Sequence, residues 1–191
     1  MSKLRTAIFG GSFDPIHIGH LSLAAEVCRR GMADEVWFMV SPQNPHKQSI
    51  ALTDENIRYR MVQLAIEGVA EFKASDFEFS LPRPSYTIKT LDALEKAYPN
   101  HEFRLLIGSD NWEKFDRWYN GDEILSRFGV IVYPRGEKTA PPLPSGVEWL
   151  PAELYNVSST MIRGMVAAGE DISALVPNSV AACIETEKLY R

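Results

Sequence analysis

Two glycines followed by two histidines make up the segment of this sequence with the clearest chemical character. The segment runs from Gly10 to His20 and reads Gly-Gly-Ser-Phe-Asp-Pro-Ile-His-Ile-Gly-His. Glycines let a ligand approach the backbone closely, and His17 and His20, three residues apart at an expected helix start, can point to the same side. Their ring N–H groups, beside the amides of a helix start, favour an anion such as phosphate. Taken alone, the segment also fits a plain turn with two surface histidines.

A second group of candidate phosphate-binding side chains lies near residue 160. The segment from Val157 to Arg163 reads Val-Ser-Ser-Thr-Met-Ile-Arg. Hydroxyl groups at a helix start, such as those of Ser159 and Thr160, can cap the helix or donate to a phosphate. Arg163 follows Thr160 by three residues, so it lies on the same helix face, and its guanidinium can bind phosphate through two hydrogen bonds. Taken alone, the pattern favours an ordinary cap with a solvated arginine.

Lys47 is the third candidate for contact with an anion. It lies in the segment Ser-Pro-Gln-Asn-Pro-His-Lys, residues 41–47, directly after an expected strand. A loop lysine is usually solvated, but ligands of parallel sheets bind beyond the carboxyl ends of the strands. Lys47 is therefore a candidate for neutralising an anionic ligand at that edge.

The fourth candidate is the aromatic segment from Gly108 to Tyr119. If this segment is one helix, Trp112, Phe115 and Tyr119 share a face, and that face is expected in the core. Trp118 falls off this face. An indole outside the core is a candidate for stacking on a ligand ring.

The elements expected to position these residues alternate along the chain. Apolar segments typical of buried strands cover residues 4–9, 36–40, 71–75, 103–107 and 128–133. Between them, helices are expected near residues 19–30, 54–67 (with Thr53 as N-cap) and 86–97, and the part after residue 158 is mostly helical. Strands that are apolar throughout and alternate with helices indicate an α/β fold. We expect a Rossmann-like, doubly wound parallel sheet with helices on both faces and a helical C-terminal part.

Composition narrows the class of protein. The chain has 191 residues, of which 45% are hydrophobic and 24% charged, which predicts a single domain over residues 1–191. No stretch is apolar enough for a membrane span, no signal peptide is evident, and two cysteines are too few for a disulfide framework. The net charge of −5, without a lysine or arginine cluster, argues against nucleic-acid binding. A cytoplasmic enzyme or binding protein is expected.

Together, the two phosphate-binding candidates resemble a known superfamily. Gly10–His20 is similar to the signature of the H-x-G-H nucleotidyltransferases, and Val157–Arg163 is similar to their second ATP motif, I-S-S-T-x-x-R, with valine in place of isoleucine. Within the superfamily the chain resembles the bacterial nicotinate-nucleotide adenylyltransferases, from residue 7 to about residue 164. The supporting residues are Pro45-His46-Lys47, Arg60-Met61 with Ala65, Pro84-Ser85-Tyr86-Thr87 with Thr90-Leu91, Gly108-Ser109-Asp110 and Phe115-x-x-Trp118-Tyr119. Asn44 departs from the usual second proline, and the loop over residues 136–146 follows no family pattern.

The resemblance implies adenylyl transfer from ATP to nicotinate mononucleotide, which gives nicotinate adenine dinucleotide and pyrophosphate in NAD biosynthesis by direct in-line attack. The residues that it implies are catalytic His17, His20, Lys47 and Arg163; ATP-binding Gly10, Gly11, Ser12, Phe13, His17, His20, Ser159, Thr160 and Arg163; and substrate-binding Lys47, Thr87, Asp110, Trp118 and Tyr119. Mg²⁺ is expected to arrive with ATP, held mainly by ATP oxygens and water, with no protein metal ligand.

Two other functions stay open from the sequence. Another H-x-G-H enzyme, such as phosphopantetheine adenylyltransferase, would share both phosphate motifs, although the aromatic segment favours a flat acceptor. A non-catalytic nucleotide-binding module would share the fold, although its motifs would be expected to be broken. The choice between nicotinate and nicotinamide mononucleotide, and the oligomeric state, do not follow from the side chains.

Overall fold

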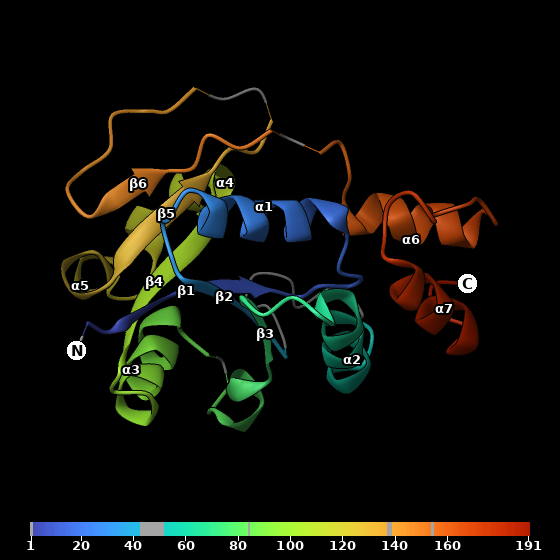
Figure 1. Ribbon diagram of the computed structural model, residues 1–191, viewed down its shortest axis with the longest axis horizontal. Helices are drawn as coiled ribbons and strands as arrows, with labels where there is room; N and C mark the ends of the chain where they lie inside the picture. The colour runs from blue at the N-terminus through green and yellow to red at the C-terminus, as the bar shows by residue number, and fades with distance from the viewer. Residues whose placement is uncertain (1, 43–51, 84, 137–138, 154) are drawn as a thin grey trace.

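A parallel sheet with helices on both faces forms the centre of the protein (Figure 1). The computed structural model describes residues 2–42, 52–83, 85–136, 139–153 and 155–191. The strands, all paired in parallel, are β1 (Leu4–Gly11), β2 (Glu35–Val40), β3 (Phe72–Ser75), β4 (His101–Gly108), β5 (Gly129–Tyr133) and β6 (Val147–Trp149). The α-helices are α1 (Ile18–Arg29), α2 (Glu55–Ile66), α3 (Thr87–Ala97), α4 (Ser109–Trp112), α5 (Gly121–Arg127), α6 (Ser159–Ala167) and α7 (Asn178–Thr186).

The order of the strands confirms the expected Rossmann-like, doubly wound sheet. The strands lie in the order β3-β2-β1-β4-β5-β6, so the chain winds outward from β1 in one direction and from β4 in the other. Five of these strands match the apolar segments of the sequence. Strand β6 was not among them, because three residues are too few to show a pattern.

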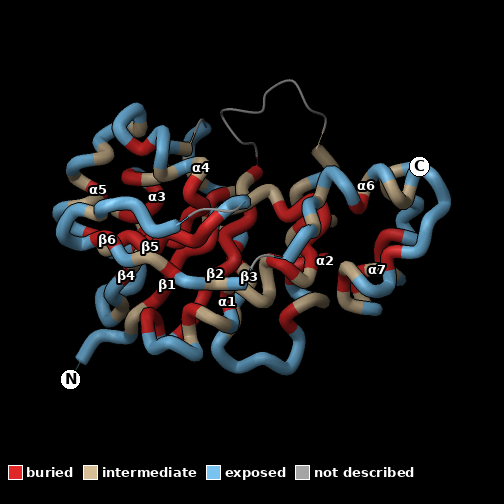
Figure 2. Tube along the Cα trace, turned by 90° about the horizontal axis from the view of Figure 1, so that it is seen from above, coloured by how far each residue is buried: buried red, intermediate tan, exposed pale blue. Residues whose placement is uncertain are grey.

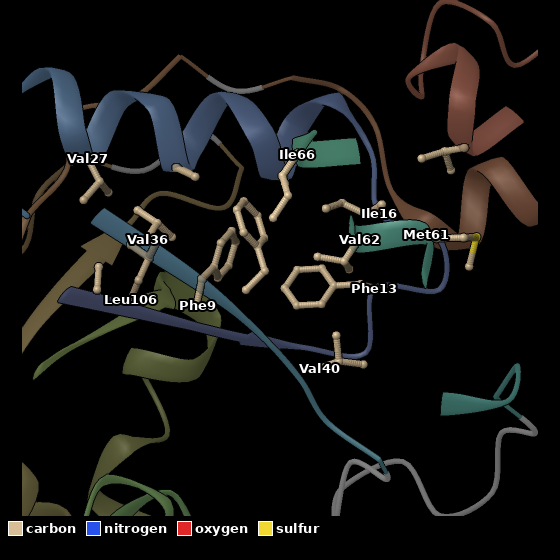
Figure 3. Packing of buried hydrophobic residues seen from close by; sticks show 14 of the residues in the cluster. Phe9, Phe13, Ile16, Val27, Val36, Val40, Met61, Val62, Ile66 and Leu106 are labelled. Atoms are coloured by element: carbon tan, nitrogen blue, oxygen red, sulfur yellow. The ribbon is translucent and has the colours of Figure 1, made fainter. Parts of the chain in front are cut away.

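Apolar side chains on both faces explain why the strands are apolar throughout. Alternate residues of β1 point to opposite faces, so that Ala7 and Phe9 pack beneath α1 and α2, whereas Ile8 belongs to a second cluster with α3 and α5. Figure 3 shows Phe9, Val36 and Leu106 from the strands below Val27 of α1. The central strands are buried along most of their length, and the outer helix faces are exposed (Figure 2).

Helix α2 begins one residue later than expected. The N-cap is Asp54, whose carboxylate accepts a hydrogen bond of 2.9 Å from the backbone N–H of Asn56. The prediction of Thr53 as N-cap was wrong: the backbone N–H of Thr53 donates to Asp14 in the loop after β1, and its carbonyl accepts from Arg58 within α2.

Helices α6 and α7 extend the fold beyond the sheet, at the right-hand end of Figure 1. Helix α7 packs on α2, where the Ser179 hydroxyl donates to the Leu64 carbonyl and Arg60 pairs with Glu187. The residues after α7 run back toward the edge of the sheet where β1 ends, and Tyr190 contacts Asp14 there. Across the described ranges, no helix has both the length and the apolar character that a membrane crossing requires.

Candidate active site

The candidate active site lies where the winding of the sheet reverses. Strand β1 ends at Gly11 and its neighbour β4 ends at Gly108, so the segments that follow them leave the same edge of the sheet. The carboxyl edge at such a reversal is where open α/β sheets bind ligands. A Cβ at Gly11 would lie 3.0 Å from the ring of Phe13, so glycine at this position lets that ring pack against the backbone.

His17 and His20 lie together at the start of α1, as their spacing predicts. Their rings stack with centroids 3.7 Å apart, and His17 is the N-cap of the helix. The backbone N–H of His17 donates to Nδ1 of His20 over 3.3 Å, which places the proton of a neutral His20 ring on Nε2. Nδ1 of His17 is buried without a hydrogen-bond partner in the described structure. His17 therefore has a ring nitrogen that no group of the described structure uses.

Both imidazoles are neutral at pH 7. Burial, together with the nearby charge of Arg135, lowers the pKa of His17 to about 4. Burial also lowers the pKa of His20 well below its ordinary value, and the neighbouring His17 and Arg135 add to the effect. The His20 ring packs edge-on against Phe9 and Phe13, which accounts for its desolvation.

The lowered pKa of His17 predicts that the fold loses stability as the pH falls. Unfolded histidine binds a proton near pH 6.5, whereas native His17 binds one only near pH 4, so acid favours the unfolded chain. The contribution of His17 to the free energy of unfolding is complete above about pH 6.5. Protonation of the unfolded chain lowers this free energy by about 2 kcal/mol between pH 7 and pH 5. Urea unfolding at both pH values should show a smaller acid-induced loss in His17→Asn than in the wild type. Equal losses in the two proteins would contradict the buried neutral ring.

The second motif folds against the first. Ser158 is the N-cap of α6 and accepts from the Met161 N–H. The Ser159 hydroxyl donates to the Pro15 carbonyl over 2.9 Å, and Nη1 of Arg163 donates to the Asp14 carbonyl over 2.7 Å. Nη2 of Arg163 also lies 3.3 Å from the Thr160 hydroxyl. Arg163 is therefore half-buried and held in place, which excludes the freely solvated arginine of the simpler interpretation.

Arg58 is a buried arginine that the sequence interpretation missed. Its guanidinium is 1% exposed and donates to the carbonyls of Ser12, Ser41, Pro42 and Thr53, over 2.7, 2.8, 3.1 and 2.8 Å. Burial lowers its pKa from the ordinary arginine value, and the charge of Asp14 opposes that shift. Arg58 shares a helix face with the buried Met61 and Val62, and an arginine on an apolar face is the signal that could have revealed it.

Arg135 is a second cation that the sequence did not indicate. It follows β5, and its backbone N–H donates to the Ser109 hydroxyl over 2.9 Å. Its Nε lies 3.5 Å from Oδ1 of Asp110, and its charge acts on the His17 and His20 rings. The site thus gathers Arg58, Arg135 and Arg163 beside the carboxylates of Asp14 and Asp110.

The aromatic segment after β4 does not form the single helix on which its interpretation rested. Helix α4 stops at Trp112, and a short 3₁₀ helix covers Phe115–Arg117. Tyr119, expected in the core, is 52% exposed, and its ring lies 4.8 Å from that of Tyr86. Trp118, expected outside the core, is half-buried with its ring 5.1 Å from Phe115. The break in the helix rotates the residues after it away from the face that an unbroken helix would present.

Thr87 and Asp110 lie at the same edge of the sheet in the described structure. Thr87 opens α3, directly after Tyr86. Asp110 follows β4, and one of its carboxylate oxygens is buried without a hydrogen-bond partner. Lys47 lies outside the described residues. In the ranges that the structure describes, no three His, Cys, Asp or Glu side chains form a group that could hold a metal ion.

The fold and the paired motifs define a nucleotidyltransferase of the Rossmann-like class, and residues 8–165 match the family described as cytidylyltransferase-like. Among curated proteins, the chain is 51% identical over 176 residues to a nicotinate-nucleotide adenylyltransferase of Bacteroides fragilis, covering 90% of this chain and 87% of the relative. It is 41% identical over 189 residues to one of Cytophaga hutchinsonii, covering 98% of each. The chain belongs to the nicotinate-nucleotide adenylyltransferase family within the cytidylyltransferase-like proteins.

Solved structures agree on the fold. A nicotinate-nucleotide adenylyltransferase structure from Vibrio parahaemolyticus superposes with a TM-score of 0.73 at 27% identity, covering 100% of this chain and 96% of that one. The nicotinic acid mononucleotide adenylyltransferase of Plasmodium falciparum, complexed with NaAD, superposes with a TM-score of 0.79 at 21% identity, covering 98% and 97%.

Proposed function

We propose that this protein transfers the adenylyl group of ATP to nicotinate mononucleotide and releases pyrophosphate, a step of NAD biosynthesis. The relatives carry the name of this activity. The observation in the structure that supports it best is the meeting of the two motifs, in which Arg163 and Ser159 bind the carbonyls of Asp14 and Pro15 beside the stacked histidines. This arrangement gathers N–H donors and a guanidinium at the carboxyl edge of the sheet, where a triphosphate needs them.

The reaction is an in-line displacement at the α-phosphorus of ATP. An oxygen of the acceptor's 5′-phosphate forms the new bond to phosphorus, and the bond to the β-phosphate oxygen breaks, so that pyrophosphate leaves with its electron pair. Such chemistry depends on positioning and charge stabilisation and needs no protein nucleophile. Mg²⁺ would be carried by ATP, without a protein ligand, and would supply charge neutralisation at the phosphates.

We assign the ATP phosphates to both motifs. His17 and His20 would contact the reacting phosphate, with the backbone of Gly10, Gly11, Ser12 and Phe13 lining the same site. Ser159, Thr160 and Arg163 would hold the β- and γ-phosphates that leave. The imidazoles are neutral in the free protein, and the negative charge of a bound triphosphate would raise the pKa of both rings. Lys47 would neutralise the attacking phosphate.

We assign the nicotinate nucleotide to the residues beyond β4 and at the start of α3. These are Thr87, Asp110, Trp118 and Tyr119, with the Asp110 carboxylate, whose Oδ1 lies 3.5 Å from Nε of Arg135, as the acceptor for a ribose hydroxyl. Trp118 is the candidate for stacking on the pyridine ring.

Trp118→Ala should weaken nicotinate mononucleotide binding by about tenfold, because stacking on a flat ring is lost. Since the indole also packs on Phe115, we expect a moderate loss of stability, about 1–2 kcal/mol. KM measurements for each substrate and thermal unfolding check both effects. Unchanged KM for the nucleotide with a large loss of stability would assign Trp118 to the core alone.

The proposed function is tested by pyrophosphate release from ATP and Mg²⁺, with nicotinate mononucleotide, nicotinamide mononucleotide and phosphopantetheine offered separately. We expect fast release with the nicotinate nucleotide. Release with phosphopantetheine alone would keep the phosphate site but overturn the assignment of residues 85–119. If protein that binds ATP released no pyrophosphate with any of the three acceptors, the result would favour a non-catalytic module.

We further propose that residues 1–191 work as one nucleotidyltransferase domain, since both hydrophobic clusters are built on the same sheet. We place the reaction in the cytoplasm, in agreement with two free cysteines, Cys28 and Cys183.

A further inference from the structure

Tyr190 reaches the first phosphate motif from the far end of the sequence. Its hydroxyl donates to Oδ1 of Asp14 over 2.5 Å. Asp14 is 2% exposed and lies between Phe13 and Pro15, inside the loop that leads to His17. A carboxylate buried this far needs hydrogen-bond donors, and Tyr190 is a main one.

Asp14 connects this hydroxyl to the second motif. Its other carboxylate oxygen accepts from the Thr53 N–H over 3.2 Å, and its backbone carbonyl accepts from Arg163 over 2.7 Å. The carbonyl of Pro15, one residue on, accepts from Ser159. A displacement of Asp14 therefore moves the acceptors that orient both Ser159 and Arg163.

Tyr190 is itself held by the packing of α7. The Leu189 N–H donates to the Ile184 carbonyl over 3.0 Å, and Leu189 and Tyr190 pack against the same hydrophobic cluster as α1 and α2. Lys188 and Tyr190 adopt left-handed backbone conformations, with φ of 54° and 61°. Such conformations are uncommon for residues other than glycine and persist where surrounding contacts maintain them.

We propose that Tyr190 is a positioning residue of the ATP site: its hydroxyl holds Asp14, and Asp14 holds the loop and the arginine that bind the triphosphate. The inference rests on the proposed function for its kinetic test, but its binding test needs ATP alone. Tyr190 acts through Asp14 and touches no reacting atom.

The test is Tyr190→Phe, which removes one hydroxyl and keeps the ring. Because a hydrogen bond to a charged group is lost, we expect the Kd for a non-hydrolysable ATP analogue and the KM for ATP to rise about tenfold. We expect the KM for nicotinate mononucleotide to stay within about twofold. Tyr98→Phe is the matched control, since Tyr98 follows α3 at the opposite edge of the sheet, and it should leave every constant unchanged.

A double-variant cycle tests whether the effect passes through Asp14. In an Asp14→Asn background, Tyr190→Phe should change the analogue Kd by less than about threefold, because the charged acceptor is already gone. Full additivity of the two changes would overturn the proposal. So would an unchanged analogue Kd, or a fall in kcat alone that matches a loss of folded protein in thermal unfolding.

The experiments distinguish a failure of the proposed function from a failure of the role of Tyr190. If the wild type binds the ATP analogue but transfers nothing to nicotinate mononucleotide, the proposed function fails and the analogue Kd still decides the role of Tyr190. If the wild type is active and Tyr190→Phe equals it in Kd and in both KM values, only the role of Tyr190 fails.

Discussion

Replacement of His17 by alanine should lower the turnover number by about 100-fold or more, with the KM values of both substrates changed by less than about threefold. The reason is that negative charge builds up on the phosphate oxygens as the displacement proceeds, so a donor at this place acts most strongly in the transition state. The rings of the pair stack with centroids 3.7 Å apart and are largely buried, and a site of low polarity strengthens such an interaction. Steady-state pyrophosphate release is the measurement.

A suitable control for this variant is His101→Gln. His101 begins β4 at the opposite edge of the sheet, where Nδ1 lies 2.8 Å from the Thr6 hydroxyl. Its loss should leave the turnover number within about twofold, although stability can fall. If His17→Ala matched the wild-type turnover number, His17 would have no part in the chemistry.

Replacement of Arg58 by methionine should cost the fold about 3–5 kcal/mol, the largest stability effect that we expect from a single change in this protein. Methionine fills much of the same space but donates no hydrogen bond, so four carbonyls that now share one guanidinium lose their donor. These carbonyls come from the loop after β1, the loop after β2 and the residue before the α2 cap. The free energy of unfolding in urea is the measurement, and any folded variant should also bind ATP weakly.

Arg60→Met is the matched control, two residues further along α2. Arg60 is more than half exposed and forms a surface ion pair with Glu187, so its loss should cost less than about 1 kcal/mol. The loss of unfolding free energy in Arg58→Lys should lie between the losses in Arg58→Met and Arg60→Met. The lysine ammonium keeps three donors but lacks the fixed planar geometry of the guanidinium. If the free energy of unfolding of Arg58→Met were within about 1 kcal/mol of the wild-type value, the result would contradict a bridging role for this arginine.

The sequence by itself determined the fold class and showed the two motifs that we propose to bind phosphate. Parallel strands that are buried on both faces have to be apolar throughout, and helices that cover them repeat their apolar positions, so the alternation of the two patterns is visible in the residues. The motif Gly10–His20 is equally visible, because a close turn and a helix start impose residue types over a short stretch. Where the helical pattern was continued across the break after Trp112, the predicted burial was wrong for Tyr119, whereas Phe115 is buried as predicted.

Only the tertiary structure decided how the candidate residues are held and charged. The neutral state of His17 and His20 follows from their burial, which for His20 includes edge-on contacts with Phe9 and Phe13, and from the nearby charge of Arg135. None of these contacts is encoded in the three-residue spacing of the histidines. The bonds from Arg163 and Tyr190 to Asp14 join residues 149 and 176 positions apart. A local pattern records whether a side chain is buried, because burial repeats with the period of its own helix or strand. It does not record which distant group is the partner, since that depends on how whole elements pack.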